Sequence, residues 1–95
     1  MKTYTESEIT KQLETLDGWE YIDNAIETTF EFNNFRDTFS VMSRIAFEAE
    51  DLQHHPEWTN VYNKLTIRLS THDAGGVTQK DFELAARIES IIEID

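Results

Sequence analysis

Two stretches of the sequence alternate apolar and polar residues with a period of two, and this pattern restricts the fold more than any other feature. In residues 26–32, one set of side chains is Ile, Thr and Phe and the other is Glu and Thr. Residues 59–71 repeat the alternation, with an interruption at Asn63. Strands that bury one face and expose the other have this pattern, so an antiparallel sheet with one covered face is expected. The inward side chains predicted for the second stretch are Val61, Leu65, Ile67 and Leu69.

Three further segments are predicted to be helices, because each begins with a capping residue that an acid follows three residues later. These starts are Thr5 with Glu8, Asn34 with Asp37, and Thr78 with Asp81. The first helix is expected to end before Gly18, the second to cover Phe35–Leu52 and the third to reach the C-terminal region. Apolar residues at spacings of three and four predict the buried face of each helix. These are Ile9, Leu13 and Leu16; Phe35, Phe39, Met42, Ala46 and Ala49; and Phe82, Ala85, Ile88 and Ile92.

The order of these segments predicts the fold class. Residues 19–22 form another expected strand, which a turn at Asp23-Asn24 joins to residues 26–32. The prediction is an α+β fold of order α-β-β-α-β-β-α, with a four-stranded antiparallel sheet and three helices on one face. Because 95 residues is the size of one domain, residues 1–95 are expected to share a single core.

The acidic composition argues against several classes of function. The sequence has 19 Asp and Glu residues against 8 Lys and Arg residues, a formal charge of −11. Binding to phosphate backbones and anionic membranes depends on basic side chains, so we expect no direct nucleic-acid or membrane partner. Cysteine is absent, which excludes thiolate catalysis and Cys-based zinc sites. No long apolar run is visible, and a cytoplasmic location is expected.

The side chains that titrate near neutral pH lie between residues 54 and 76. The three histidines of the chain all lie here: His54, His55 and His72. Pro56 restricts the residue before it to extended conformations, so the second helix is expected to end near His54-His55 and turn into a strand. Glu50 precedes His54 by four residues and would share a face with it on a continuing helix. Imidazole exchanges protons near neutral pH, which makes this corner a candidate acid/base site.

A longer pattern surrounds these histidines. It comprises Glu50, His54-His55-Pro56, Asn60-Val61-Tyr62, His72 and Asp81, with Trp58, Thr71-His72-Asp73 and Gly76-Val77-Thr78 beside them. In this pattern the chain resembles the pterin-4a-carbinolamine dehydratase family, whose fold has the same order of helices and strands. The resemblance implies a lyase that dehydrates a 4a-hydroxytetrahydropterin to a quinonoid dihydropterin. It implies a step of tetrahydrobiopterin recycling after an aromatic amino acid hydroxylase, with pterin as substrate and with no cofactor or metal.

The resemblance also implies catalytic roles for single residues. His54 and His72 are the expected acid/base pair. His55 is the expected substrate-binding and proton-assisting residue. Glu50 is expected to orient a histidine or raise its basicity, and Asp81 to lie beside His72 or its loop.

Three more residues are expected to bind substrate or to support the site: Trp58, Thr71 and Asp73. Trp58 would provide a wall against the flat pteridine ring. Asp81 also has a structural interpretation, because it is the acid of the capping pattern that begins at Thr78.

Two other functions are compatible with the sequence. Some members of this family act as dimerisation partners of a homeodomain transcription factor, so the resemblance also admits a protein-binding module without catalysis. The second alternative is a metal site built from His54, His72 and Glu50, since two imidazoles and a carboxylate can hold zinc. The small core and the open sheet edges favour a homodimer or homotetramer.

Overall fold

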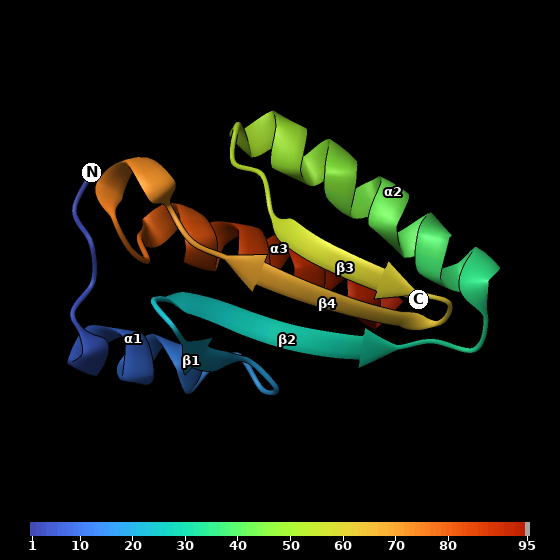
Figure 1. Cartoon of the computed structure of the whole chain (residues 1–95), viewed down its shortest axis with the longest axis horizontal. Coiled ribbons are helices and arrows are strands. Elements are labelled where there is room, and N and C mark those ends of the chain that lie inside the picture. The colour runs from blue at the N-terminus through green and yellow to red at the C-terminus, as the bar shows by residue number, and fades with distance from the viewer. Residues whose placement is uncertain (95) are drawn as a thin grey trace.

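The computed structural model describes residues 1–94 and confirms the predicted order of elements (Figure 1). The elements are α1 (Glu6–Leu13), β1 (Glu20–Ile22), β2 (Ala25–Glu31), α2 (Phe35–Leu52), β3 (Glu57–Val61), β4 (Lys64–Leu69), the 3-10 helix η1 (His72–Ala74) and α3 (Gln79–Ile94). The strands form one antiparallel sheet in the order β1-β2-β4-β3. Among the helices of residues 1–94, none has the length and apolar character of a membrane span.

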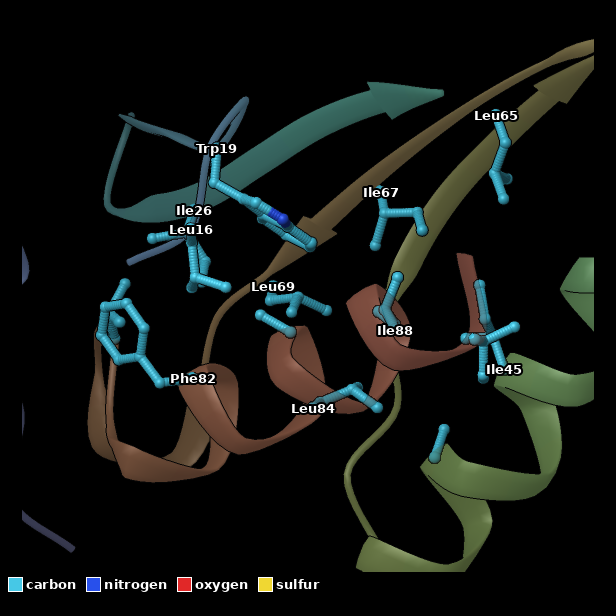
Figure 2. Packing of buried hydrophobic residues seen from close by; sticks show 14 of the residues in the cluster. Leu16, Trp19, Ile26, Ile45, Leu65, Ile67, Leu69, Phe82, Leu84 and Ile88 are labelled. Atoms are coloured by element: carbon cyan, nitrogen blue, oxygen red, sulfur yellow. The ribbon is translucent and has the colours of Figure 1, made fainter. Parts of the chain in front are cut away.

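One hydrophobic core lies between the sheet and the helices (Figure 2). β4 is an inner strand, and its apolar side chains Leu65, Ile67 and Leu69 are completely buried. Ile45 of α2 and Ile88 of α3 are completely buried in the same cluster. Burial of each such side chain contributes about 1.5–3 kcal/mol. This packing fixes the sheet against the helices, and the ends of these elements carry the candidate site.

The predicted alternation is confirmed in β4 but is wrong at Val61, which is 69% exposed. Val61 pairs with Lys64, whereas Asn60 pairs with Leu65. Paired residues of antiparallel strands lie on the same face of the sheet. The inward position of Leu65 therefore turns Asn60 inward and Val61 outward. The turn residue Tyr62 has a φ of 52°, and the turn shifts the phase of the alternation between the two strands.

The face that α2 buries matches the predicted one only in part. Phe35 and Phe39 are 48% and 55% exposed, and Phe47 is 75% exposed. The buried residues of the helix are Thr38, Val41, Ile45 and Ala49. These residues also recur at spacings of three and four, so periodicity alone does not choose between the two faces. The predicted core role is wrong for Phe35, Phe39 and Ala46, which are exposed. It is confirmed for Ala49, which is buried, and for Met42, which packs against the core. A row of aromatic side chains therefore lies on the surface.

Between β2 and β4, the opposite face of the sheet is polar. Pairs across this face join β2 and β4: Glu27 with Arg68, Thr29 with Thr66, and Glu31 with Lys64. The Thr29 and Thr66 hydroxyl oxygens lie 3.0 Å apart. Exposed ion pairs contribute about 0–1 kcal/mol each, so these residues keep the face hydrated rather than stabilise the fold.

Arg87 ties α3 to the last turns of α2. Its Nη1 group donates to Oδ2 of Asp51 and to Oε1 of Glu48, each at 2.8 Å. These hydrogen bonds, first the one to Asp51 and then the one to Glu48, raise the pKa of Arg87 above its ordinary value. The Arg87 side chain therefore links the end of α2, which leads to His54, to the helix that carries Asp81.

Candidate active site

The end of α2 directs the two adjacent histidines to different places. Gln53 has a left-handed backbone (φ 53°), and its N–H donates to the carbonyl oxygen of Glu50 at 3.1 Å. The N–H of His54 donates to the carbonyl oxygen of Ala49 at 3.0 Å, which completes a Schellman-type ending. The helix thus stops at Leu52. The predicted end of the helix before His54-His55 is confirmed, so the shared face that a continuing helix would give Glu50 and His54 does not form.

His55 lies at the exposed side of this corner. Its Nε2 atom is 2.8 Å from Oε1 of Glu50, so the acid predicted to orient a histidine contacts His55. The two side chains are 61% and 71% exposed. An ion pair so exposed contributes at most about 1 kcal/mol. Its consequence is therefore the orientation of the His55 ring rather than the stability of the fold.

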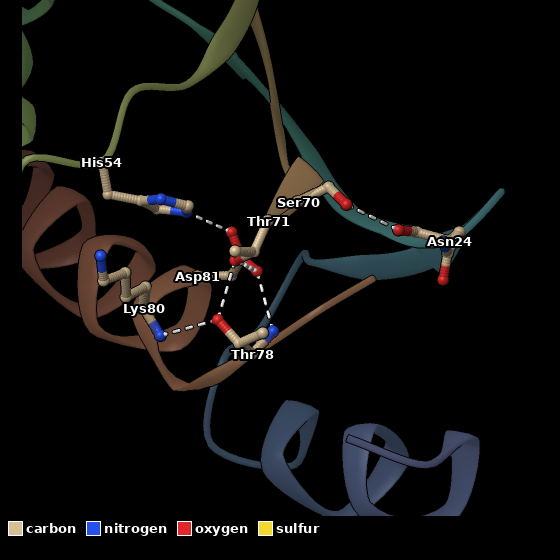
Figure 3. Close-up of polar contacts among 7 residues, drawn as sticks. All are labelled: Asn24, His54, Ser70, Thr71, Thr78, Lys80 and Asp81. Carbon is tan, nitrogen blue, oxygen red and sulfur yellow. Dashed lines mark hydrogen bonds and ion pairs between the residues drawn. The ribbon is translucent and has the colours of Figure 1, made fainter. Parts of the chain in front are cut away.

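His54 points inward and pairs with Asp81 (Figure 3). The His54 Nε2 and Asp81 Oδ1 atoms lie 2.5 Å apart. His54 is 8% exposed and Asp81 is completely buried. A buried carboxylate is tolerated only when its oxygens are hydrogen-bonded or paired. Here one oxygen of Asp81 is committed to the imidazole.

The second carboxylate oxygen of Asp81 caps the start of α3. Oδ2 accepts hydrogen bonds from the Thr78 N–H and from the Thr71 hydroxyl, both at 2.9 Å (Figure 3). The Thr78 hydroxyl lies 2.8 Å from that of Thr71, and it donates there because the single Thr71 proton is given to Asp81. The predicted capping role of Asp81 is therefore confirmed. The same carboxylate holds the cap, the residue before His72 and the ring of His54.

His55 and His72 line one pocket of about 560 Å³. Its lining residues are Asp23, Asn24, His55, Pro56, Glu57, Arg68, Ser70, His72, Gly75 and Gly76. The two histidines come from separate parts of the chain, the corner after α2 and the start of η1. They meet because β3 and β4 are antiparallel neighbours, so the start of one lies beside the end of the other. His54 is not among these lining residues, although it directly precedes two of them.

The loop that presents His72 is closed on itself. The Thr71 N–H donates to the Gly76 carbonyl oxygen at 2.9 Å, and the Gly75 N–H donates to that of His72 at 3.0 Å. Gly75 has a φ of +80°, a conformation that glycine adopts without steric cost. His72 is exposed on this loop. These hydrogen bonds close the loop, and His72 on it lines the pocket.

The structure places Trp58 and Asp73 away from the lining of the pocket. Trp58 is half-buried and packs against the core, and Asp73 is exposed on η1. Sequence reasoning did not select Asn24 and Arg68 as site residues, although both line the pocket. Asn24 belongs to the predicted turn, and Arg68 lies between the predicted inward residues Ile67 and Leu69 of a strand. Neither pattern shows that the β1–β2 turn lies against the His72 loop.

A second cavity of about 390 Å³ is lined by residues of β2, α2 and α3, including Phe30, Val41 and Ile92. None of its described lining residues is a histidine, so the candidate chemistry lies in the other pocket. Within residues 1–94, no three His, Asp or Glu side chains form a group with the geometry of a metal site. Glu50 contacts His55, and His54 contacts Asp81, so these residues have partners within the protein.

Comparisons with known proteins give a consistent result. The family described as Pterin 4 alpha carbinolamine dehydratase matches residues 2–91. A Christiangramia forsetii relative is 57% identical over 93 residues, which cover 98% of this chain and 96% of that protein. An Opitutus terrae relative is 54% identical over 88 residues, covering 92% and 91%. Both are provisionally named pterin-4-alpha-carbinolamine dehydratase.

A solved structure has the same fold. The crystal structure of a transcriptional coactivator/pterin dehydratase from Brucella melitensis matches with a TM-score of 0.92 and 41% identity. The match covers 95% of this chain and 98% of that one. Family pattern, relatives and structure all span nearly the whole chain, and the protein therefore belongs to the pterin-4-alpha-carbinolamine dehydratase family.

Proposed function

We propose that this protein dehydrates a 4a-hydroxytetrahydropterin to the quinonoid dihydropterin by histidine acid/base catalysis. The observation that carries the proposal is one pocket lined by His55 and His72, imidazoles from two separate chain segments. Membership of the family supports the substrate class. The pterin is the substrate, and the chemistry requires no further cofactor. The substrate would come from an aromatic amino acid hydroxylase reaction in the cytoplasm.

The reaction needs two proton transfers and no net proton. A protonated imidazole gives its proton to the 4a-hydroxyl group, the C4a–O bond breaks and water leaves. The N5 lone pair forms the C4a–N5 double bond, and a neutral imidazole accepts the N5 proton. A carbinolamine loses water slowly without help, so positioned histidines need to supply only about 10²- to 10⁴-fold acceleration.

We assign the acid/base pair to His72 and His54. His72 is exposed and lines the pocket. His54 is 8% exposed and directly precedes His55 and Pro56, which also line the pocket. A buried carboxylate that bonds one imidazole nitrogen fixes the orientation of the ring, and Asp81 is placed to do this for His54. His55, whose Nε2 is bound to Glu50, is assigned to substrate binding.

The proposal predicts faster decay of 4a-hydroxytetrahydropterin in the presence of the protein. Stopped-flow measurements compare the decay with and without protein from about pH 5 to pH 8, the range in which imidazole changes charge. The wild-type protein is expected to accelerate the decay with a histidine-like pH dependence. The His54→Ala/His72→Ala double variant is expected to return the rate to that of buffer. A wild-type rate equal to that of buffer contradicts the proposal.

Self-association is the second part of the proposal, and the exposed face of α2 supports it. Phe39 and Phe47 lie four residues on either side of Ser43, and Arg36 and Glu50 lie seven residues on either side of it. A second copy of α2, antiparallel about a two-fold axis at Ser43, would place Phe39 opposite Phe47 and Arg36 opposite Glu50. Such a symmetric contact pairs aromatic side chains with each other and joins opposite charges.

The pairing predicts that Phe39→Glu converts the associated protein to monomer. Size-exclusion chromatography with light scattering measures the change, and Ser90→Glu, an exposed residue of α3, is the control with the same added charge. Both substitutions are on the surface, so folding should change by no more than about 0.5 kcal/mol. A monomeric wild-type protein, or an equal effect of both variants, contradicts the pairing. If the alternative function as a protein-binding module were the main one, the wild-type protein would associate without accelerating the dehydration.

A further inference from the structure

The turn between β1 and β2 is bound to the loop that carries His72. The Asn24 Nδ2 group donates to the carbonyl oxygen of Gly75 at 2.8 Å. The Ser70 hydroxyl donates to the carbonyl oxygen of Asn24 at 3.0 Å (Figure 3). The Tyr21 hydroxyl lies 3.3 Å from Oδ1 of Asn24, so the carbonyl side of this amide has a donor of its own. The nitrogen side of the amide therefore faces the His72 loop.

The turn itself is held by hydrogen bonds from β4. Asp23 and Asn24 have φ values of 49° and 64°, the left-handed pair of a two-residue hairpin turn. The Arg68 guanidinium donates to the carbonyl oxygens of Ile22 and Asp23, at 3.0 and 2.6 Å. Arg68 comes from β4, so the turn is attached to the strand that leads into His72.

The loop and the turn approach each other closely at Gly76. A Cβ atom at this position would lie 3.2 Å from Oδ1 of Asn24 and 3.3 Å from Cγ2 of Thr3. The contact is therefore tight on the side of the loop that faces the turn. The carbonyl that Asn24 holds belongs to Gly75, whose N–H closes η1 on the carbonyl of His72. Movement of this carbonyl would be transmitted directly to the backbone of His72.

We infer that Asn24 is a positioning residue for His72 and acts through the Gly75 carbonyl rather than on the substrate. This inference rests on the proposed function for its catalytic consequence. Catalysis by an exposed imidazole depends on its placement, because a misplacement of about 1 Å can cost about 100-fold in rate. The three-residue 3-10 helix η1 does not by itself fix the position of the His72 side chain, since such helices have poor hydrogen-bond geometry.

Asn24→Gly tests the inference, because glycine keeps the left-handed turn and removes the amide. We expect kcat to fall about tenfold with little change in KM, a shifted pH profile, and a displaced or broadened His72 ring signal in long-range 1H–15N spectra. Asn24→Asp places an oxygen against the Gly75 carbonyl and should have a larger effect. Tyr62→Gly, at the left-handed turn of the other hairpin, is the matched control and should leave all four measurements unchanged.

The kinetic measurements and the His72 ring signal together separate this inference from the proposed function. If wild-type protein accelerates the dehydration and Asn24→Gly has the wild-type kcat, pH profile and His72 signal, the positioning role is overturned and the function stands. If wild-type protein gives no acceleration, the function fails, and the His72 signal alone decides whether Asn24 positions the ring. An equal displacement of the signal in Tyr62→Gly would also overturn the inference, because the effect would then be general loosening.

Discussion

Replacement of His72 by alanine is expected to lower the catalysed rate by about 10²- to 10⁴-fold, the usual contribution of a positioned proton donor or acceptor. His72 is exposed on η1, and its side chain is not part of the buried core. The loss should therefore appear in kcat and not in the folding transition. Stopped-flow decay of 4a-hydroxytetrahydropterin, with substrate concentration varied, measures both kcat and KM.

Two comparisons make this result specific. Ser90→Ala, an exposed residue of α3, is expected to retain the wild-type rate and shows the effect of a neutral surface change. His55→Ala is expected to raise KM more than it lowers kcat, because His55 is assigned to substrate binding. A His72→Ala protein with the wild-type kcat would rule out His72 as an acid or base. Equal losses of kcat in the His55 and His72 variants would contradict the assignment of separate roles.

Asp81→Ala is expected to destabilise the fold by about 3–5 kcal/mol, because three groups lose a hydrogen-bond partner and each one left unsatisfied in the interior costs about 1–3 kcal/mol. The substitution removes the partner of His54 and the acceptor of the Thr78 N–H and the Thr71 hydroxyl. Urea denaturation measures the change through its midpoint at constant slope. A stability within about 0.5 kcal/mol of wild type, the usual range for surface substitutions, would contradict the role of Asp81 described above.

Asp81→Asn separates the charge from the hydrogen bonds. The amide keeps an oxygen that can accept from the Thr78 N–H, so we expect a smaller loss of about 1–3 kcal/mol. In a double-mutant cycle, His54→Ala with Asp81→Ala should cost less than the sum of the single variants, because the second substitution no longer strands a partner. Additive costs would show that the two side chains are not coupled.

Much of the fold could be predicted from local patterns in the sequence. The alternation in residues 26–32 gave the inward face of β2, and Leu65, Ile67 and Leu69 gave that of β4, because the side-chain period of a strand is two residues. The caps at Thr5 and Asn34 gave two of the helix starts, since a side-chain oxygen there satisfies a free N–H of the first turn. These rules act over a few residues, so no tertiary structure is needed to apply them.

The prediction of buried faces failed where two local patterns indicated a buried face equally well. α2 has apolar residues on more than one face, and the structure buries Val41 and Ile45 while it leaves Phe39 exposed. The helix is oriented by its fit to the sheet and α3, which the spacing of its own residues does not contain. The outward position of Val61 has a similar origin, because pairing with β4 sets the face of each residue in β3.

The sequence by itself therefore determined the elements, their order and the corner at which two histidines lie. Only the tertiary structure decided which residues meet there. His54 and Asp81 are 27 positions apart, and Asn24 and Gly75 are 51 positions apart. Antiparallel pairing of Ile26 with Leu69 brings the β1–β2 turn beside the end of β4 and the loop that carries His72. Such contacts depend on strand order and register, which arise from the packing of the whole chain and not from any local pattern.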